Sequence, residues 1–592
     1  MKKIVKVLCC LLIFTYILSL QTQIFAENNI QAVKPFADVP KSSYAYSAIN
    51  ELRQLGVTDG IGNNRFGFGS LITRGEFVTF LVKLMGWKQV TPAKGSFTDN
   101  QDRKKTWYSP VETTLANGII SKDGGKFRPA EKITREEMAV MIVKSMGYGT
   151  LADQLHYLNK PFTDVTKNIG YVTIAKDTGI VNNKAALFNP SGKAFKEQAA
   201  VMLINLHHNL IRPLKDLNAF YAILSSSQQD KIPDFSSVCF GWSKLSYNES
   251  SGNIILNSSR NAAGLGYNEY YLPTGFTQRL SAAKESGAAA MLMVQSTQNS
   301  KITDPATGLK VGIPEYVLSR PEVYRKLIAD IVSSVNSTTL GSETGSFDGV
   351  AIDIEGLKGL KLKLLFNNFL KELKTSLDKE DKKLYVAVQP LIHPTISASS
   401  NDGYDYAAIG SIADKVILMA HDYDATNLTQ ADMARGFDIT PLTPVENVYY
   451  ALEAITDVKN GVQDKSKIML QISFDWTVWQ KKDGKIINSV PLSFSLENFI
   501  ELLNSGTAIS YQYSNNYGNP YLKYINPKTG TENTVWYENT ESVMDKIKLV
   551  ELFGIQGISL WRLGTIPDYQ PDDGRNLGMD IWQNILLELE KN

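Results

Sequence analysis

The chain has 592 residues, of which 43% are hydrophobic, 10% aromatic and 20% charged, and this is the composition of a folded protein rather than of a disordered one. Its length suggests roughly two to four domains, since a domain usually contains about 100–200 residues and barrels run larger. The 61 basic and 60 acidic residues leave a net charge of +1, so no global imbalance favours nucleic acid or an acidic membrane as the partner.

The first residues have the pattern of an export signal. Three lysines precede an apolar run from Val7 to Leu20, and a polar stretch follows that closes on Ala26. We therefore predict a secretory signal peptide over residues 1–26. The alternative, a transmembrane anchor, is disfavoured because the apolar run is shorter than the roughly 20 residues that span a bilayer. Removal of the peptide leaves Cys239 as the only cysteine, which excludes an internal disulfide.

Three repeats occupy the next part of the chain. They begin at Phe36, Phe97 and Phe162, and each contains F-x-D, an amphipathic helix, a Gly-containing turn and an R/K-F or L-F step. A second helix follows, which "ITRGE" and "ITREE" open in the first two repeats and "AFKEQ" opens in the third. Repeats of this length bury their apolar faces against their neighbours, and about three suffice for a stable array.

These repeats resemble S-layer homology domains, at residues 35–88, 96–149 and 161–210. The resemblance implies a helical three-repeat module that attaches an exported bacterial protein to secondary cell-wall polysaccharide. It also implies that Arg74 and Arg135 contact acidic polymer, as a guanidinium fork at a helix start can. The third repeat departs from the pattern, because Lys196 stands at the position of the arginine and lacks the fork. Without the repeat, both arginines would be read as solvated residues at helix starts.

From about Leu214 the sequence changes to short apolar runs that alternate with amphipathic segments. Near-continuous apolar runs are typical of parallel strands that are buried on both faces. Eight runs begin at Ala219, Ser237, Ala288, Phe347, Leu384, Lys415, Lys467 and Gly557. We therefore predict an α/β fold, a (β/α)8 barrel over residues 215–592, with an insertion from Tyr511 to Tyr537 before the last strand. An open doubly wound sheet is the alternative, but no Gly-rich phosphate loop follows the first run.

The fourth run, "FDGVAIDIEG", carries two acids at its carboxyl end. Asp353 and Glu355 are two residues apart, so both side chains project to the same side of a strand. Catalytic groups of a barrel gather at the carboxyl ends of its strands. Neighbouring buried carboxyls raise each other's pKa, which would leave one protonated acid able to donate. The alternative is a pair of loop-edge carboxylates that cap the next helix.

The same segment resembles the D-G-x-D-x-D-x-E signature of family 18 glycoside hydrolases, the chitinase-like barrels. "LMAHDYD" and "GISLWRLG" resemble the sixth-strand and last-strand motifs of that family, and residues 535–561 look most like bacterial peptidoglycan N-acetylglucosaminidases. The resemblance implies hydrolysis of β-1,4-linked N-acetylglucosamine glycans, in peptidoglycan or a chitin-like polymer. It further implies a retaining mechanism in which the substrate's own acetamido oxygen attacks the anomeric carbon.

The resemblance also assigns roles to individual residues. Glu355 would be the general acid and base, and Asp353 would hold and polarise the acetamido group. The substrate-binding residues would be His421, Asp422 and Tyr423 around the acetamido group and Trp561 stacked on the sugar ring.

Two positions depart from the family pattern. Ala351 stands at the middle Asp of the signature, so Asp353 lacks its usual carboxylate neighbour, and His421 stands at the position of a Tyr. An imidazole can replace the hydroxyl as a donor, but it titrates near neutral pH. These departures favour the alternative of a catalytically impaired carbohydrate-binding or structural surface protein. A third class, a two-carboxylate glycosidase, would need a second acid, for which Asp475 is the candidate.

No metal or cofactor is expected, because the five histidines form no H-E-x-x-H and the chain has no paired-Cys spacing. The expected partners are secondary cell-wall polysaccharide and an N-acetylglucosamine-containing glycan, with no nucleic acid and, after signal removal, no membrane. We therefore expect a secreted protein at the cell wall or S-layer surface of a bacterium.

Overall fold

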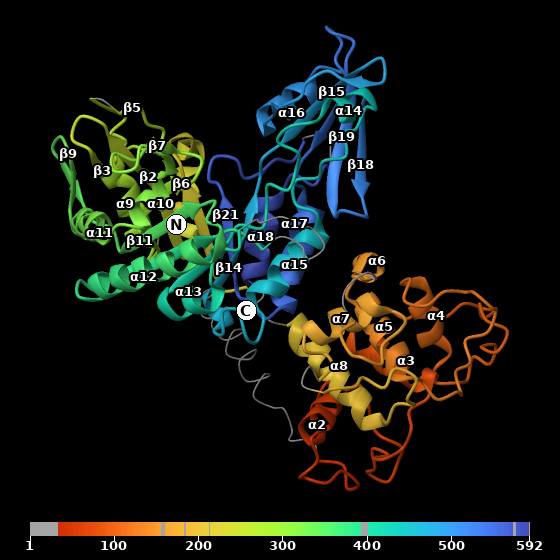
Figure 1. Ribbon diagram of the computed structural model, residues 1–592. Coiled ribbons are helices and arrows are strands. Elements are labelled where there is room, and N and C mark those ends of the chain that lie inside the picture. The colour runs from red at the N-terminus through yellow and green to blue at the C-terminus, as the bar shows by residue number, and fades with distance from the viewer. Residues whose placement is uncertain are drawn as a thin grey trace, which may run out of the picture. The chain divides into compact units, whose positions relative to one another are not determined.

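The computed structural model describes residues 34–155, 160–182, 185–211, 214–263, 265–391, 401–571 and 576–590. The predicted signal peptide lies outside these residues. The chain divides into two compact units, one holding the three repeats and the other the eight apolar runs (Figure 1). None of the described helices combines the length and the apolar character needed to cross a membrane.

Each repeat folds into a pair of helices. The pairs are α2 (Tyr46–Gln54) with α3 (Arg74–Leu84), α4 (Tyr108–Ala116) with α5 (Arg135–Ser145), and α7 (Ile169–Asp177) with α8 (Lys196–Leu210), and the short α6 (Gly149–Gln154) follows the second pair. The threonine before α3 and the threonine before α5 each form a capping box with the glutamate three residues later.

The F-x-D motif stabilises the loop that leads into the second helix of each repeat. The aspartate of the motif accepts hydrogen bonds from backbone N–H groups of that loop. Asp38, for example, accepts them from Phe66 and Gly67, at 2.7 and 2.8 Å. The equivalent aspartates of the other two repeats make the same bonds. The phenylalanine of the motif packs on the phenylalanine of the R/K-F or L-F dipeptide later in the same repeat. The ring centroids are 5.7, 5.8 and 5.6 Å apart in the three repeats.

The three repeats close into a ring rather than forming an open row. Ile133 donates its N–H to the carbonyl of Ile72, Ala194 donates to Ile133, and Ile72 donates to Ala194, at 3.2, 2.9 and 3.0 Å. These three residues stand at the same position of the three repeats, just before the second helix. Each repeat therefore contacts both of the others through its backbone.

The second unit contains a closed barrel of eight parallel strands. The strands are β1 (Asp216–Tyr221), β2 (Ser237–Asn248), β6 (Ala289–Thr297), β11 (Gly349–Glu355), β12 (Lys383–Val388), β13 (Lys415–Leu418), β14 (Ile468–Ser473) and β21 (Gly557–Trp561). Strand β1 pairs with both β2 and β21, which closes the sheet. All eight predicted runs form these strands in the predicted order, so the predicted barrel is confirmed.

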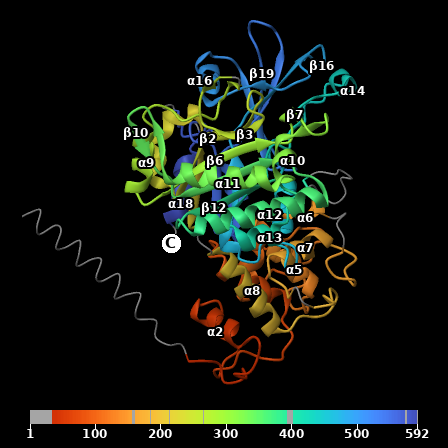
Figure 2. The same cartoon turned by 60° about the vertical axis from the view of Figure 1, so that its left-hand side comes forward.

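Helices cover the outside of the barrel. They are α9 (Phe276–Glu285), α10 (Ile313–Leu318), α11 (Pro321–Asn336), α12 (Gly359–Asp378), α13 (Tyr406–Ile412), α15 (Val445–Ile455), α17 (Thr540–Leu552) and α18 (Ile581–Glu590), with the 3-10 segments η2 (Ile223–Asp234) and η3 (Lys465–Lys467). Figure 2 shows α11, α12 and α13 side by side in this layer. Helix α12 buries Phe366, Leu370, Leu373 and Leu377, which recur at the three- and four-residue spacing of one helix face.

The interior of the barrel is a packed core. Ten buried residues meet there from the inner faces of several strands, among them Phe220, Met293, Ala351, Tyr385 and Met469. Ala351 is 1% exposed and lies opposite Met293 in the register of β11 and β6. The position that corresponds to the middle Asp of the resembled signature is thus filled by a methyl group in an apolar layer, two residues before Asp353 on the same side of the strand.

The predicted insertion is a small antiparallel sheet with an added helix. Its strands are β15 (Thr477–Lys482), β16 (Lys485–Ile486), β17 (Leu492–Ser493), β18 (Ile509–Ser514), β19 (Asn519–Ile525) and β20 (Glu532–Trp536), and its helix is α16 (Leu496–Asn504). It begins directly after β14 and therefore earlier than the tyrosine-rich stretch alone indicates. Because it leaves the barrel after the carboxyl end of a strand, it stands at the rim where barrel active sites form (Figure 1).

The remaining short elements lie in the loops of the barrel. They are β3 (Asn253–Asn257), which pairs with β2, the hairpins β4 (Asn261–Ala262) with β5 (Gly266–Tyr267), β7 (Lys301–Thr303) with β8 (Lys310–Gly312) and β9 (Thr338–Leu340) with β10 (Glu343–Gly345), and helix α14 (Gln430–Ala434).

Candidate functional site

The acids of the fourth strand lie at the two ends of β11. Asp348, just before the strand, accepts the N–H of Ala290 at 2.8 Å and so links two neighbouring strands at their amino ends. Asp353 and Glu355 lie at the carboxyl end, where Asp353 is 3% exposed and Glu355 is partly exposed. The strand therefore delivers only the last two carboxyls to the rim.

Burial governs the ionisation of these two carboxyls. It raises the pKa of Asp353 well above its usual range, and the nearby Glu355 raises it further. Burial also raises the pKa of Glu355, with a further rise from Asp422. The two carboxyls titrate as a pair, and their environment favours the retention of a proton, as a general acid requires.

A cavity of about 250 Å³ opens beside the pair. It is lined by Asp353, Glu355, Gln389, Pro390, Asn401, Met419, His421, Asp422, Tyr423, Gln471 and Trp561. All six catalytic and substrate-binding residues expected from the sequence thus line one cavity. Oδ1 of Asp353 is buried and has no hydrogen-bond partner among the described residues, so it is available to accept a bond from a ligand.

His421 lies between two acceptors at the wall of this cavity. Its Nε2 is 2.7 Å from Oε1 of Gln471, and its Nδ1 is 2.9 Å from a carboxylate oxygen of Asp422. Burial disfavours the imidazolium, but these two neighbours outweigh burial and raise the pKa of His421 to about 8. The side chain is therefore cationic at neutral pH and lowers the pKa of both Asp353 and Glu355.

A buried chain of hydrogen bonds fixes the orientation of Gln471. Its Nε2 donates to Oγ of Ser559 at 3.4 Å, and Ser559 donates to Oδ1 of Asn218 at 2.7 Å. Asn218 in turn donates to the hydroxyl of Ser237 at 2.8 Å. Because the amide nitrogen of Gln471 faces Ser559, its oxygen faces His421, and this arrangement favours a protonated Nε2.

The other expected binding residues differ in their surroundings. Asp422 has a left-handed backbone, with φ of 59°, and a side chain that is 62% exposed. The backbone N–H of Tyr423 donates to the carbonyl of Leu442 at 3.0 Å, which ties the rim of β13 to a later loop. Trp561 is partly exposed at the end of β21 and packs against Phe220, with ring centroids 5.4 Å apart.

Asp475, the candidate second acid, does not line the cavity. Ser473 donates a hydrogen bond to its carboxylate at 3.1 Å. Burial and the charge of Asp422 raise its pKa, whereas the hydrogen bond from Ser473 and the charges of His421 and Arg562 lower it. Asp475 thus belongs to the electrostatic surroundings of His421 rather than to the wall of the site.

Two residues that line the cavity were not predicted from the sequence, although their position in the sequence indicates a role at the rim. Gln389 and Gln471 are lone polar residues near the carboxyl ends of two otherwise apolar runs. Oε1 of Gln389 accepts the N–H of Gly356 at 2.7 Å, which holds the loop that follows Glu355. A polar side chain inside a buried strand needs a partner, and this need marks both residues as part of the rim.

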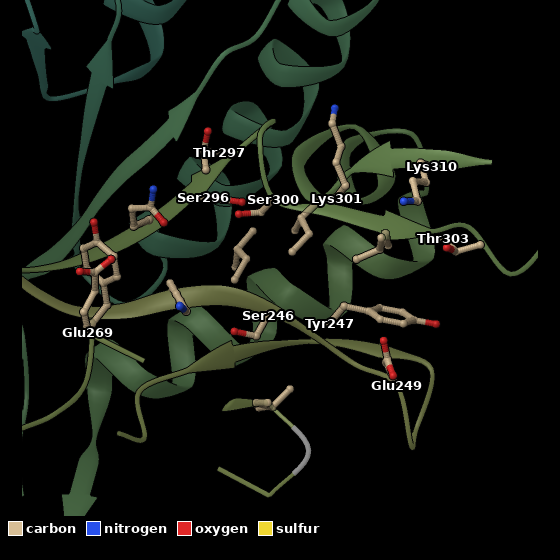
Figure 3. A pocket seen from close by; sticks show the side chains of 17 residues that line it. Ser246, Tyr247, Glu249, Glu269, Ser296, Thr297, Ser300, Lys301, Thr303 and Lys310 are labelled. Atoms are coloured by element: carbon tan, nitrogen blue, oxygen red, sulfur yellow. The ribbon is translucent and has the colours of Figure 1, made fainter. Parts of the chain in front are cut away.

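A larger pocket of about 760 Å³ adjoins this site on the side of β2 and β6. Figure 3 shows its labelled side chains, with Ser246, Tyr247 and Glu249 on one wall and Ser296, Thr297 and Ser300 on the other. Tyr270 lines this pocket and is close enough to Asp353 and Glu355 for their charges to act on its hydroxyl. The two cavities are therefore neighbours at one rim of the barrel.

The motif cations of the repeats lie at the three junctions of the ring. Arg74 lies at the first junction, between repeats one and two, Arg135 at the second, between repeats two and three, and Lys196 at the third, between repeats three and one. The backbone N–H of each donates across its junction to the next repeat, at 2.9, 3.1 and 2.9 Å. The three positions are thus structurally equivalent.

Arg74 and Lys196 are buried and paired. Arg74 forms an ion pair with Glu137 and donates from Nε to the carbonyl of Phe127 at 2.9 Å. Lys196 forms an ion pair with Glu76 at 2.8 Å. Both side chains are at most 10% exposed. The third junction is therefore intact despite the replacement of arginine by lysine.

Arg135 is partly exposed and makes fewer contacts. Its Nε donates to the carbonyl of Phe188 at 2.7 Å, and its guanidinium lies 4.9 Å from the centroid of that ring. Among the residues that the structure describes, it forms no ion pair. Burial lowers the pKa of its guanidinium, and the charges of Tyr44 and Asp164 act in the opposite direction.

Comparison with known proteins agrees with both parts of the architecture. Glycosyl hydrolases family 18 matches residues 312–565, and the S-layer homology domain matches residues 35–78 and 96–139. The chain therefore carries S-layer homology repeats followed by a glycosyl hydrolase family 18 domain, as the motifs indicated. In the described part of the chain, no group of three or more His, Cys, Asp or Glu side chains is arranged to hold a metal ion.

Curated relatives match different parts of the chain. The putative sporulation-specific glycosylase YdhD of Bacillus subtilis is 25% identical over 285 residues, which covers 46% of this chain and 60% of that protein. The cortical fragment-lytic enzyme of Bacillus subtilis is 24% identical over 293 residues, covering 49% and 60%. The S-layer protein sap of Bacillus anthracis is 32% identical over 115 residues, covering 19% and 14%. The chain thus spans 60% or less of the length of these relatives.

Among solved structures, the spore cortex-lytic enzyme SleL of Bacillus cereus is similar, with a TM-score of 0.45 and 17% identity. The similarity covers 64% of this chain and 75% of that one.

Proposed function

We propose that the repeats anchor the protein to bacterial secondary cell-wall polysaccharide and that the barrel hydrolyses a β-1,4-linked N-acetylglucosamine-containing glycan by a substrate-assisted retaining mechanism. One observation carries the enzymatic part of the proposal. Asp353 and Glu355 share the wall of a cavity at the carboxyl rim, and the buried Oδ1 of Asp353 lacks a partner among the described residues. In this proposal, that oxygen accepts the N–H of the acetamido group of the substrate.

In the first step, the carbonyl oxygen of the 2-acetamido group attacks the anomeric carbon while the bond from that carbon to the leaving oxygen breaks. Glu355 gives its proton to the leaving oxygen. The acetamido group becomes a cationic oxazolinium, and ionised Asp353 stabilises it through the N–H that it accepts. The raised pKa of the carboxyl pair supports this step, because a proton must be present on the pair at the start.

In the second step, water attacks the anomeric carbon from the side that the leaving group occupied. Glu355, now ionised, takes the proton of that water, the oxazolinium ring opens, and the acetamido group is restored. Two inversions leave the anomeric configuration unchanged. The cationic His421 supports the first step, since it favours the ionised form of Glu355 that remains after proton donation and the ionised form of Asp353 that faces the oxazolinium.

Two further observations support a polymeric wall substrate. The pocket next to the catalytic cavity, with tyrosines and hydroxyl side chains in its walls, offers room for further sugar units. The names of two relatives refer to sporulation and to cortical fragments. We therefore propose peptidoglycan as the substrate ahead of a chitin-like polymer, and secretion to the cell wall or S-layer surface as the location.

The decisive experiment compares the full chain with Glu355→Gln on N-acetylglucosamine oligomers and on purified peptidoglycan. We expect the parent to release reducing ends and the variant to lose at least about a hundredfold in rate while it still binds the glycan. Activity that survives in Glu355→Gln but disappears in Asp475→Asn would instead establish a two-carboxylate mechanism.

A second candidate function rests on Ala351. With a methyl group in an apolar layer below Asp353, that carboxyl has no carboxylate neighbour on its inner side. The barrel would then bind glycan as a surface protein without useful turnover. In the same experiment, binding by parent and variant alike with no release of reducing ends by either would establish this function.

A further inference from the structure

The pocket between β2 and β6 contains three lysines that the proposed reaction does not use. Lys244 lies in the second half of β2, and Lys301 and Lys310 begin the two strands of the β7–β8 hairpin (Figure 3). None of the three ammonium groups forms a hydrogen bond or an ion pair with the described residues. The pocket also holds Glu249 and Glu269, which are exposed and form no ion pair with those residues either. The cations in the pocket therefore outnumber its carboxylates and lack internal counter-ions.

The sheet register places Lys244 in line with the catalytic acids. Lys244 lies beside Gln295 in the parallel pairing of β2 with β6, and Gln295 lies beside Asp353 in the pairing of β6 with β11. Residues paired in this way project to the same face of a sheet, which here is the mouth of the barrel. Neighbouring strands are about 4.8 Å apart, so the backbone at Lys244 is about 10 Å from that at Asp353. This separation places Lys244 at a sugar next to the one that Asp353 holds.

The wall of the pocket also contains a buried polar atom without a partner. Ser296 is 2% exposed, and its Oγ forms no hydrogen bond with the described residues. It lines the pocket together with the hydroxyl side chains of Ser246, Thr297 and Ser300. A buried hydroxyl in a folded protein usually has a partner, so this one indicates a polar group that a ligand supplies.

We propose that this pocket binds a carboxylate carried by a sugar next to the N-acetylglucosamine unit that is cleaved. The inference rests on the proposed function and names the chemical group by which the barrel selects its substrate. In peptidoglycan, N-acetylglucosamine alternates with N-acetylmuramic acid, so both neighbours of the cleaved unit carry a lactyl group. That group either ends in a carboxylate or continues into a peptide with carboxylates of its own. A chitin-like polymer carries neither.

Ammonium and hydroxyl groups suit this ligand. Both donate hydrogen bonds to a carboxylate, and a lysine acts as a point charge on a flexible stem, so it accepts a carboxylate from more than one direction. Lys244 is partly buried, whereas Lys301 and Lys310 are exposed. Because solvent and salt screen exposed charges more strongly, Lys244 contributes most to the binding of the carboxylate.

The test measures the release of reducing ends by the full chain from purified peptidoglycan strands and from neutral N-acetylglucosamine oligomers. The strands are used with their peptides, with free lactyl carboxylates after amidase digestion, and with all carboxyls chemically reduced to alcohols. We expect Lys244→Gln to raise KM for acidic strands by about tenfold and to leave kcat unchanged, because the lost contact is equally strong in the ground state and in the transition state. KM for the reduced strands and for the oligomers should not change.

Lys358→Gln is the matched control, because Lys358 is exposed at the same rim and lines neither cavity. It should behave like the parent on every substrate. Ser296→Ala should raise KM for acidic strands by about threefold, since it removes one hydrogen bond to the ligand. It should not lower the melting temperature, because the hydroxyl has no partner among the described residues.

The two acidic strands separate the sources of the carboxylate. A loss in Lys244→Gln that is confined to the amidase-treated strands assigns the lactyl carboxylate, and a loss confined to the peptide-bearing strands assigns the peptide. An equal loss on the neutral oligomers, the same loss in Lys358→Gln, or an unchanged KM of Lys244→Gln on both acidic strands would overturn the inference.

Binding measurements in Glu355→Gln distinguish this failure from failure of the proposed hydrolase. If the parent releases no reducing ends, but adding Lys244→Gln to Glu355→Gln weakens calorimetric binding of acidic strands alone, hydrolysis is wrong and the carboxylate pocket stands. If the parent cleaves acidic, reduced and neutral glycans equally well and Lys244→Gln changes nothing, hydrolysis stands and the carboxylate pocket is wrong.

Discussion

The repeat ring and the barrel rim differ in whether their buried charged groups have a partner. At the first and third junctions of the ring, each buried cation meets a carboxylate, so these charges hold the repeats together. At the rim, burial raises the pKa of both Asp353 and Glu355, and one buried oxygen of Asp353 has no partner among the described residues. Compensated groups build the structure, whereas uncompensated groups mark the places where a ligand is expected.

The largest effect is expected from Asp353→Asn. The change removes the negative charge that stabilises the cationic oxazolinium and should lower kcat by about a hundredfold to a thousandfold. It should not lower the melting temperature, because the buried carboxyl is under-satisfied in the free protein. Steady-state kinetics and thermal unfolding measure the two effects. Unchanged activity would show that Asp353 has no role in the reaction. A loss of stability that accompanies the loss of activity would show that Asp353, like the paired charges of the ring, stabilises the fold.

The opposite result is expected for Glu137→Gln in the repeats. It leaves the buried Arg74 cation without its counter-ion, and we expect a loss of about 2 kcal/mol in the free energy of unfolding, moderated by the partial exposure of Glu137. Hydrolase activity should not change. Glu131→Gln, at an exposed position near the same junction, is the matched control for urea unfolding.

The charge of His421 predicts a dependence on pH. Its pKa is raised to about 8 in the folded protein, above the ordinary value of 6.5. The stabilisation is therefore complete below pH 6.5 and is lost as the pH rises through 8, a change of about 2 kcal/mol. Activity should fall over the same range, since the carboxyls then lose the nearby cation.

Urea unfolding at pH 6 and pH 9 and a profile of kcat/KM against pH check this prediction. In His421→Gln the alkaline fall should disappear. An alkaline fall that persists in this variant would assign it to another group.

The smallest effect is expected from Ser559→Ala in the buried hydrogen-bond chain. The change leaves Nε2 of Gln471 and Oδ1 of Asn218 each without one partner, and the expected cost is about 1 kcal/mol in unfolding free energy. Because Gln471 is then free to turn, the alkaline limb of the pH profile should move toward lower pH. A Ser559→Thr variant, which keeps the hydroxyl, should restore it.

Much of the fold was predictable because its signals are local. The eight apolar runs and the F-x-D repeats need only neighbouring residues to be recognised, and the placement of Asp353 and Glu355 follows from the two-residue period of a strand. The pairing of Arg74 with Glu137 was not predictable in this way, because the two residues are 63 positions apart. The same holds for the contact of His421 with Gln471, which depends on the register between β13 and β14.

The ring of backbone hydrogen bonds through Ile72, Ile133 and Ala194 has a consequence for evolution and engineering. An open row of repeats can lose or gain a unit at either end, but a ring of three has no end at which to do so. Deleting the divergent third repeat would expose the unpaired backbone groups and apolar faces of both remaining repeats. The repeat that departs most from the motif is thus as necessary to the ring as the other two.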